Sequence, residues 1–378
     1  MNHPLPRGWK EFALKDIGNF LRGSGISKKD LSDTGIPAIR YGDIYTKYDF
    51  VIKNVSSFTN SKGTELKKGD ILFAGSGETA EEIGKSVAFI DDYKTFAGGD
   101  IIIFRPNIDL NSLFLSYILN SGKCRKDISI MGQGHTVVHI YASSLEILKV
   151  ILPPLDEQKR IADILSTFDD LIENLTKLIE KKELYKKGVM QRVLSGEVRF
   201  NGFTDEWKEV KLSDICKNIK TGKLDANAME ENGKYRFYTC AKEYYKINTY
   251  AFDGEALLIS GNGYVGYIHY YNGKFNAYQR TYVLMDFTEN IIYVKYYLDK
   301  YLKNRIKKEK NEGNIPYIVL NTLTDMKIKI PSLEEQNKIA ELLTLIDKDI
   351  EILKQLLHLR KLQKKGLMQK LLTGEVRI

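Results

Sequence analysis

Three glycines in the second half of the chain have the spacing of a dinucleotide-binding loop. Gly261, Gly263 and Gly266 follow the apolar run EALLIS and match the pattern Gly-x-Gly-x-x-Gly. In a dinucleotide site this loop opens a helix whose N-terminus binds the pyrophosphate. The residues that follow here, YVGYIHYYNG, alternate like a strand and turn at Asn272-Gly273. The sequence therefore argues against a nucleotide site at this loop.

Three other stretches each contain only part of a catalytic or metal-binding motif. Gly84-Lys85-Ser86 resembles the end of a phosphate-binding loop, but Thr79 occupies the position of the required glycine. His135 and His139 are four residues apart, without a third ligand or the glutamate of a metalloprotease helix. Glu157-Gln158-Lys159 contains a nuclease-like Glu-x-Lys, but it falls in the first turn of a predicted helix, where we interpret it as capping. We therefore expect a chain that is not an enzyme and binds no metal.

Composition and charge favour a polyanionic partner without identifying it. The 57 Lys and Arg residues exceed the 49 Asp and Glu residues, which gives a formal charge of +8. No stretch of eighteen apolar residues predicts a membrane span, and the N-terminal residues lack the apolar run of a signal peptide. The three cysteines are scattered, which fits a reducing cytoplasm.

An internal repeat organises the whole chain. The segment KKGVMQRVLSGEVRF at 186–200 returns as KKGLMQKLLTGEVRI at 364–378. PPLDEQKRIADIL at 153–165 likewise returns as PSLEEQNKIAELL at 331–343, again 178 residues later. Between these anchors both copies have apolar residues in alternating steps of four and three, the 3.5-residue period of a coiled-coil seam. The seam residues are Ile161, Leu165, Phe168, Ile172, Leu175 and Ile179 in the first copy, and Ile339, Leu343, Ile346, Ile350, Leu353 and Leu357 in the second.

The repeat predicts two long helices of equal length. Pro154 and Pro331 can precede a helix but not continue one, and Gly196 and Gly374 suit a left-handed C-cap. Each helix would span about 38 residues, or roughly 57 Å. Because a domain separates the two copies in the sequence, antiparallel pairing of the two helices is the simplest way to bury both seams.

The segments outside the helices predict two mixed, β-rich domains. GWKEFALKDI and EWKEVKLSDI open them, and β-branched and aromatic runs such as DIIIFRP and RTYVLM are typical of strands. The expected fold class is α+β, with two such domains separated by two antiparallel coiled-coil helices in a pseudo-two-fold repeat. The predicted boundaries are 1–152, 153–200, 201–330 and 331–378. The second domain holds 16 of the 23 tyrosines, interleaved with lysines, a combination that suits nucleic acid.

The helix-opening PPLDEQKRIA and PSLEEQNKIA, with the closing KKGxMQxxLxGEVR, resemble the repeats of type I restriction-modification specificity subunits. The resemblance covers the whole chain. It implies a DNA-binding, non-catalytic subunit of a restriction system whose two target-recognition domains each read one half of a bipartite, asymmetric DNA site. It also implies that the helices set the spacing and dock two methyltransferase subunits, which bind S-adenosylmethionine, and that restriction subunits, which use ATP and Mg²⁺, can join. This chain would hold none of these cofactors, and no membrane partner is expected.

Candidate DNA contacts are polar residues near predicted loops, because Arg pairs with guanine edges and Asn or Gln with adenine edges. In the first domain they are Arg40, Tyr41, Lys85, Gln133 and His135. In the second they are Lys223, Arg236, Tyr238, Asn262, Tyr264, Gln279 and Arg280. Because GDILFAGSG at 69–77 corresponds to the different GEALLISGNG at 254–263, the two domains are expected to read different half-sites.

Two alternatives explain the same repeat. A coiled-coil protein–protein scaffold with β-rich ligand-binding domains would also need long paired helices, but it explains the mixture of lysine and tyrosine less well. A specificity subunit of a related, modification-only system fits every feature of the first hypothesis. A rigid coil suits DNA reading because each base pair turns the duplex to a new face, so both the separation and the rotation of the two readers must be fixed.

Overall fold

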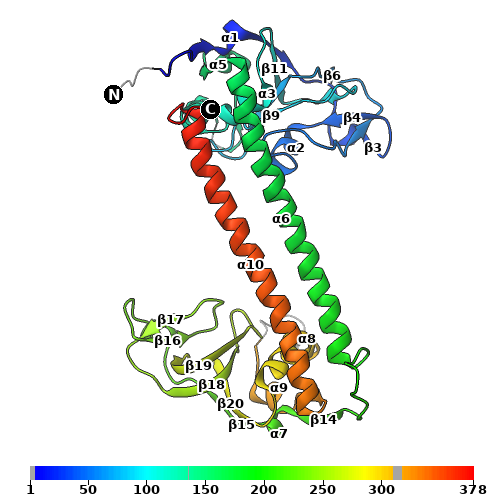
Figure 1. The fold of residues 1–378 in the computed structure, drawn as a ribbon, viewed down its shortest axis with the longest axis vertical. Coiled ribbons are helices and arrows are strands. Elements are labelled where there is room, and N and C mark those ends of the chain that lie inside the picture. The colour runs from blue at the N-terminus through cyan, green and yellow to red at the C-terminus, as the bar shows by residue number, and fades with distance from the viewer. Residues whose placement is uncertain (1–4, 135, 310–316) are drawn as a thin grey trace. The chain divides into compact units, whose positions relative to one another are not determined.

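The computed structural model describes residues 5–134, 136–309 and 317–378 (Figure 1). The chain divides into two compact units, Met1–Leu175 with Leu356–Ile378, and Thr176–Gln355. This division cuts both long helices, α6 (Leu155–Ser195) and α10 (Leu333–Leu372), so the domain boundaries expected from the sequence stay a prediction. No helix of the described residues is both long and apolar enough to cross a membrane.

The first unit is built on two small sheets. One sheet is antiparallel and has the order β2 (Gly18–Arg22), β11 (Ile101–Pro106), β7 (Ile71–Ala74), β9 (Ser86–Ala88). The other has the order β3 (Leu31–Ser32), β5 (Phe58–Thr59), β4 (Ile36–Ile39), β10 (Phe96–Ala97), β6 (Thr64–Glu65). Two further pairs are β1 (Lys10–Ala13) with β13 (Lys149–Leu152), and β8 (Ser76–Gly77) with β12 (Val138–His139). The short helices are α1 (Leu14–Ile17), α2 (Tyr41–Thr46), α3 (Ser112–Leu119), α4 (Gly122–Met131) and α5 (Ala142–Glu146).

The second unit contains one six-stranded sheet. Its order is β15 (Cys216–Thr221), β20 (Thr281–Phe287), β18 (Phe252–Ser260), β19 (Ile268–Ala277), β16 (Tyr235–Tyr238), β17 (Tyr245–Ile247). A separate pair joins β14 (Lys208–Lys211) to β21 (Lys327–Ile330). The helices are α7 (Leu212–Ile215), α8 (Ile291–Glu309) and α9 (Leu320–Thr324). The strands expected at DIIIFRP and RTYVLM are thus confirmed as β11 and β20, although each begins one residue later than its motif, at Ile101 and Thr281.

The two units repeat one topology. Three strands occur in the same order in both units, as β2–β11–β7 and as β15–β20–β18. The first strand of each set follows the segment GWKEFALKDI or EWKEVKLSDI, and the third overlaps GDILFAGSG or GEALLISGNG. A parallel contact also recurs, between β4 and β10 and between β16 and β19. Matching backbone bonds fix the correspondence, because Gly98 N donates to Ile39 O (2.8 Å) and Tyr278 N donates to Tyr238 O (2.9 Å). The internal repeat therefore extends from sequence to sheet order.

Both long helices form and run antiparallel inside each unit. In the first unit, Asp169 of α6 binds Lys364, and the earlier Glu157 binds the later Arg377. The two segments therefore run in opposite directions. In the second unit, Lys182 and Lys186 of α6 bind Asp349 (3.0 Å) and Asp347 (2.5 Å) of α10 in the same sense. The first helix begins directly after Pro154, and the second begins two residues after Pro331. Gly196 (φ +77°) and Gly374 (φ +71°) follow their ends in the left-handed conformation.

The predicted seam lies on the inner side of the helices. Eight of its members are buried and four are half-buried: Ile161, Leu165, Leu175, Ile179, Ile339, Leu343, Ile346 and Ile350, then Phe168, Ile172, Leu353 and Leu357. The first turns of each helix also pack into a domain core. Ile161 and Leu165 join the core of the first unit, and Ile339 and Leu343 join that of the second. Each long helix is therefore anchored in a domain core by its first turns.

Candidate nucleic-acid interface

Several strand ends of the six-stranded sheet converge at one place in the second unit. Gln279, after β19, donates its backbone N–H to Leu224 O (2.9 Å), which follows β15. Tyr264, after β18, donates its backbone N–H to Cys240 O (3.2 Å), which follows β16. These bonds draw together loops that are up to 55 residues apart in sequence. Four of the predicted DNA contacts, Lys223, Tyr264, Gln279 and Arg280, belong to these loops and are exposed.

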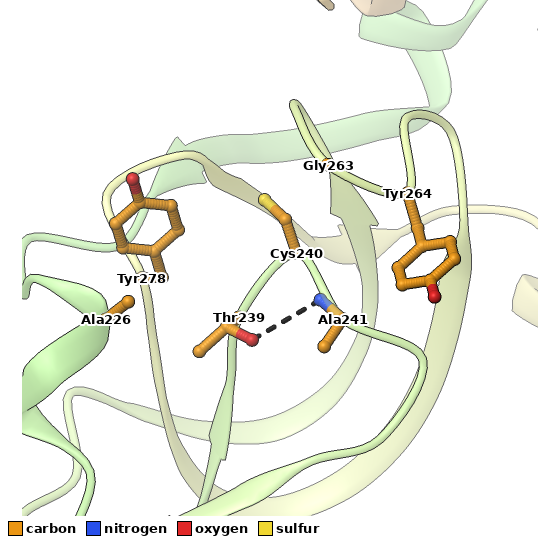
Figure 2. A pocket seen from close by; sticks show the side chains of 7 residues that line it. All are labelled: Ala226, Thr239, Cys240, Ala241, Gly263, Tyr264 and Tyr278. Atoms are coloured by element: carbon orange, nitrogen blue, oxygen red, sulfur yellow. Dashed lines mark hydrogen bonds between the residues drawn. The ribbon is translucent and has the colours of Figure 1, made fainter. Parts of the chain in front are cut away.

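A pocket of about 510 Å³ opens between these loops (Figure 2). Figure 2 shows the rings of Tyr264 and Tyr278 on either side of Cys240. Thr239 Oγ1 accepts the backbone N–H of Ala241 (3.3 Å) and so fixes the wall between them. Flat aromatic walls are typical of sites that stack nucleic-acid bases. The lining residues are Ala226, Thr239, Cys240, Ala241, Gly263, Tyr264 and Tyr278.

The side chains at the rim of this pocket are suited to hydrogen bonding with base edges. The amide of Gln279 donates to Asp225 Oδ1 (2.6 Å), which fixes its orientation. Lys242 Nζ lies 5.1 Å from the ring centroid of Tyr264 and keeps a positive charge beside it. Arg280 is exposed and forms no ion pair with any residue that the structure describes, while Asn262 is half-buried. The rim thus offers a guanidinium, which can pair with guanine edges, and amides, which can pair with adenine edges.

The Gly-x-Gly-x-x-Gly stretch forms the turn between β18 and β19, with no helix after it. The backbone N–H of Gly261 donates to Arg280 O (2.9 Å). A Cβ atom at Gly261 would come within 2.5 Å of that oxygen, so only glycine allows this close approach. Gly263 (φ +59°) and Gly266 (φ +75°) shape the rest of the turn. The glycines serve a strand-to-strand turn beside the pocket.

Two other predicted contacts of the second domain form one unit. Tyr238 is only 1% exposed, so its prediction as a direct DNA contact is wrong for the surface seen here. Its hydroxyl instead accepts a hydrogen bond from Arg236 Nη1 (3.2 Å), and Arg236 is half-buried above it. Both residues point to one face of β16 because side chains two apart in a strand share a face. Tyr238 therefore positions Arg236.

In the first domain, two predicted contacts have structural partners. Arg40 forms an ion pair with the buried Asp43 (3.3 Å) at the start of α2. Lys85 Nζ donates to Tyr48 O (2.6 Å), and burial lowers the pKa of this amine. Both side chains thus have partners within the fold, and their contact with DNA stays a prediction. Tyr41 remains exposed.

The first unit has a pocket of its own, of about 580 Å³. Its wall includes Arg22, Asp100 and His139, whose Nδ1 lies 3.0 Å from Ser76 Oγ. None of the described candidates from the sequence lines it. Gln133 is exposed nearby and exchanges two backbone hydrogen bonds with His139, whereas His135 lies outside the described residues.

Equivalent positions in the two domains carry opposite charges. Gly75 N donates to Asp100 O (2.7 Å), as Gly261 N donates to Arg280 O (2.9 Å). Asp100 is therefore the counterpart of Arg280 in the repeated topology, and each lies beside the pocket or loop cluster of its own domain. A carboxylate accepts and a guanidinium donates, so the two sites are complementary to different ligands.

No arrangement for metal binding or thiol chemistry emerges from the described residues. No three His, Cys, Asp or Glu side chains among them lie close enough to hold a metal ion. Burial raises the pKa of the Cys124 thiol to about 11, and that of Cys216 also to about 11, so both stay protonated near neutral pH.

The repeated sequence segments meet in space as two reciprocal clamps. Glu157, at the start of α6, accepts two hydrogen bonds from Arg377, after α10 (2.6 and 2.7 Å). Glu335, at the start of α10, accepts two from Arg199, after α6 (2.9 and 2.8 Å). Each arginine lies 5.9 Å from the ring centroid of the domain's own tryptophan, Trp9 or Trp207. The interpretation of Glu157 as a helix cap alone was incomplete, because Glu157, like Glu335, also binds the closing arginine of the other helix.

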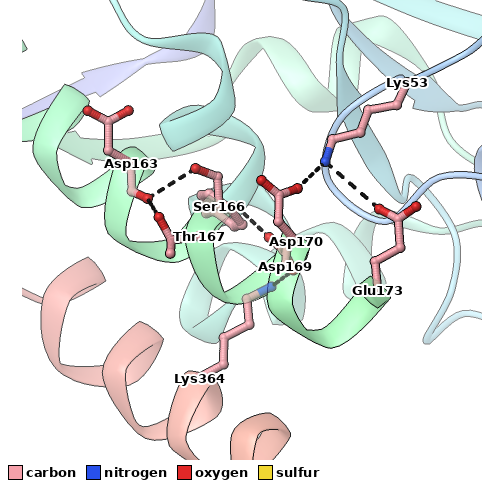
Figure 3. Close-up of polar contacts among 9 residues, drawn as sticks. Lys53, Asp163, Ser166, Thr167, Asp169, Asp170, Glu173 and Lys364 are labelled. Carbon is pink, nitrogen blue, oxygen red and sulfur yellow. Dashed lines mark hydrogen bonds and ion pairs between the residues drawn. The ribbon is translucent and has the colours of Figure 1, made fainter. Parts of the chain in front are cut away.

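A second reciprocal contact uses the lysine that opens the closing segment (Figure 3). Asp169 of α6 binds Lys364 of α10 and accepts the hydroxyl of Tyr117 (2.5 Å). Its counterpart Asp347 of α10 binds Lys186 of α6 (2.5 Å) and accepts the hydroxyl of Tyr296 (2.7 Å). The sequence contained a signal for all of these contacts, since each acid and each base recurs after 178 residues.

Comparison with known proteins gives one consistent family. The family model described as "Type I restriction modification DNA specificity domain" matches residues 6–183 and 204–359. The chain is 44% identical over 149 residues to the EcoDI specificity subunit of a type I restriction enzyme from Escherichia coli, a match that covers 39% of this chain and 32% of that subunit. It is 29% identical over 408 residues to the putative MjaX specificity subunit from Methanocaldococcus jannaschii, covering 99% and 95% of the two chains.

Solved structures share the fold. A crystal structure of the type I restriction-modification system S subunit from M. genitalium superposes with a TM-score of 0.70 at 22% identity and covers 98% of this chain and 97% of that one. A chain from a study of complex assembly and conformational transition of the type I R-M system superposes with a TM-score of 0.55 at 16% identity, covering 99% and 100%.

Proposed function

Because the chain belongs to the type I restriction-modification DNA specificity family, we propose that each of its two domains reads one half of a bipartite DNA site. The chain is a specificity subunit, a DNA-recognition component that is not itself an enzyme. The long helices would set the distance between the two readers. A component of this kind works where the DNA is, in the cytoplasm.

One observation carries the proposal: the same fold occurs twice with different chemistry at equivalent loops. Asp100 and Arg280 hold matching backbone positions and opposite charges. A pair of readers for one symmetrical site would need the same side chains in both copies. Different side chains on one scaffold suit an asymmetric site with two unlike halves.

The partners of the proposed subunit follow from the reciprocity of the helix contacts. Asp169–Lys364 and Asp347–Lys186 repeat one arrangement, as do the two glutamate–arginine clamps. Repeated structure allows two copies of one partner to dock equivalently. We infer that two methyltransferase subunits dock on the helices and bring S-adenosylmethionine, and that restriction subunits using ATP and Mg²⁺ can join. A modification-only system would lack those restriction subunits.

Selection from random duplexes tests this function. The full chain, co-expressed with its methyltransferase subunits, is expected to enrich a two-part sequence with a constant gap. Its affinity should fall steeply with salt because phosphate contacts release counterions. Enrichment of one uninterrupted sequence would contradict the bipartite reading. Absence of duplex binding at any salt concentration would favour the protein–protein scaffold.

A further inference from the structure

A second concave site lies on β16, β17 and β19 of the second domain. It has a volume of about 460 Å³ and is separate from the loop pocket of Figure 2. Four of its seven lining residues are cations and the other three are tyrosines: Lys234, Tyr235, Arg236, Tyr244, Lys246, Tyr271 and Lys274. None of these described lining residues is a carboxylate. Such a concentration of positive charge in one concavity attracts an anion.

Arg236 is held rigidly at the centre of this site. Its guanidinium carbon lies 4.3 Å from the ring centroid of Tyr244 and 4.4 Å from that of Tyr271. The buried hydroxyl of Tyr238 accepts one of its five N–H groups (3.2 Å). Two rings and one hydroxyl thus restrict the guanidinium, which leaves its other donors free to bind a ligand at little entropic cost.

The surrounding lysines remain available for a ligand. Lys234, Arg236 and Lys246 form no ion pair within the ranges that the structure describes, and Lys274 lies 4.0 Å from Asp253 at the edge. Lys274 Nζ also lies 4.6 Å from the ring centroid of Tyr250. Ammonium groups bind phosphate oxygens as point charges, without regard to base sequence.

We propose that this site binds the phosphodiester backbone of the DNA duplex and acts as an anchor that does not select bases. The proposal rests on the proposed DNA-reading function. It assigns phosphate binding to this site and base reading to the loop pocket. Thr239, which lines the loop pocket, directly follows β16 and is three residues beyond Arg236, roughly 10 Å of extended chain. The proposal requires one duplex to present a phosphate to Arg236 and base edges to the loop pocket across this short separation.

The anchor distinguishes the two domains. Tyr238 of the second domain corresponds to Ile39 of the first, because they accept the matching backbone bonds from Tyr278 and Gly98. Pro37 lies two residues before Ile39, as Arg236 lies two residues before Tyr238. The first domain thus has proline where the second has Arg236. The anchor is therefore expected to act on the half-site read by the second domain.

The test measures affinity and its salt dependence with the full chain in its complex. Arg236→Gln is expected to weaken binding about tenfold on both the selected duplex and an unrelated duplex. The slope of log affinity against log salt should fall in magnitude by about one, the loss of a single phosphate contact. Arg236→Lys should keep the salt slope, because it keeps the charge, but recover only part of the affinity, because it loses the planar fork. Tyr244→Leu should weaken binding in the same direction. Thermal melting of each variant checks that the fold is kept.

Lys217→Gln is the matched control. Lys217 is exposed on β15, at the other edge of the same sheet, so its loss of charge should leave affinity unchanged. Neutral methylphosphonates placed at successive positions should weaken the unchanged protein at one phosphate and leave Arg236→Gln unaffected there. If the unchanged protein binds DNA but Arg236→Gln has the same affinity and slope, the anchor is wrong and the proposed function stands. A loss confined to one base pair would also overturn it, by making Arg236 a base reader. If the unchanged protein binds no duplex, both fall.

Discussion

Glu335→Ala is expected to lower the free energy of unfolding by about 3 kcal/mol, whereas Glu334→Ala should cost less than about 1 kcal/mol. Glu335 is 0% exposed and accepts two hydrogen bonds from Arg199 as well as the indole N–H of Trp207 (3.3 Å). Truncation removes these charge-assisted bonds and leaves a hole where they met. Its neighbour Glu334 is 77% exposed and has only a 4.0 Å contact with Lys338.

This pair of variants separates two roles of an acidic first turn. Both glutamates have the same favourable position relative to the helix dipole, which contributes roughly 0.3–1 kcal/mol. Urea denaturation followed by tryptophan fluorescence is a suitable measurement, because Trp207 touches the clamp and the chain has two tryptophans. Glu157→Ala should have a comparable effect at the other clamp. Equal, small losses for Glu334→Ala and Glu335→Ala would show that the clamp does not stabilise the fold.

Asp169→Ala is expected to lower the free energy of unfolding by about 3 kcal/mol, and Lys364→Met by much less. Lys364 binds Asp169 (Figure 3). The side chain of Lys364 is 8% exposed, and Tyr117 is fully buried. Removing Asp169 leaves an ammonium and a hydroxyl buried without their acceptor. Removing Lys364 leaves Asp169, which is 22% exposed, still bonded to Tyr117 and partly hydrated.

The adjacent Asp170 provides the control for this prediction. Its partner Lys53 (2.5 Å) is well exposed, so Asp170→Ala should cost roughly 1 kcal/mol at most. Chemical denaturation curves of the three variants give the comparison. A loss for Lys364→Met as large as that for Asp169→Ala would mean that the attraction itself, rather than the unpaired buried groups, determines the stability.

The long helices could be predicted because their signals are local. A 3.5-residue apolar period, prolines before the first turn and glycines after the last all lie within the segment they define. The clamps join residues 136 and 220 positions apart, and no local pattern encodes such a contact. The repeat was the available signal: Glu157 and Glu335 are the same residue of a motif, and so are Arg199 and Arg377.

The candidate interface was harder to predict because exposure depends on distant strands. Arg236 and Tyr238 were both predicted as DNA contacts because they are polar and close to a loop. Arg236 is half-buried at a pocket, whereas Tyr238 lies in the core beneath it. Lys85 is polar and close to a loop, but a backbone carbonyl 37 residues away binds its amine. The loops that carry Tyr264 and Arg280 converge through backbone bonds between strands that only the folded sheet brings together. Their contact with DNA stays a prediction.

The measurement that tests the central claim most directly is site selection after both helices are shortened together. Residues 172–178 lie between Asp169 and Lys182 of α6, and residues 355–361 lie between Asp349 and Lys364 of α10, so deleting both keeps every ion pair between the two helices described above. One heptad preserves the seam and shortens each helix by roughly 10 Å, about the rise of three base pairs. If the helices set the spacing, the selected gap should shorten by up to about three base pairs while both half-site sequences stay the same. An unchanged gap, or altered half-site sequences, would contradict the account.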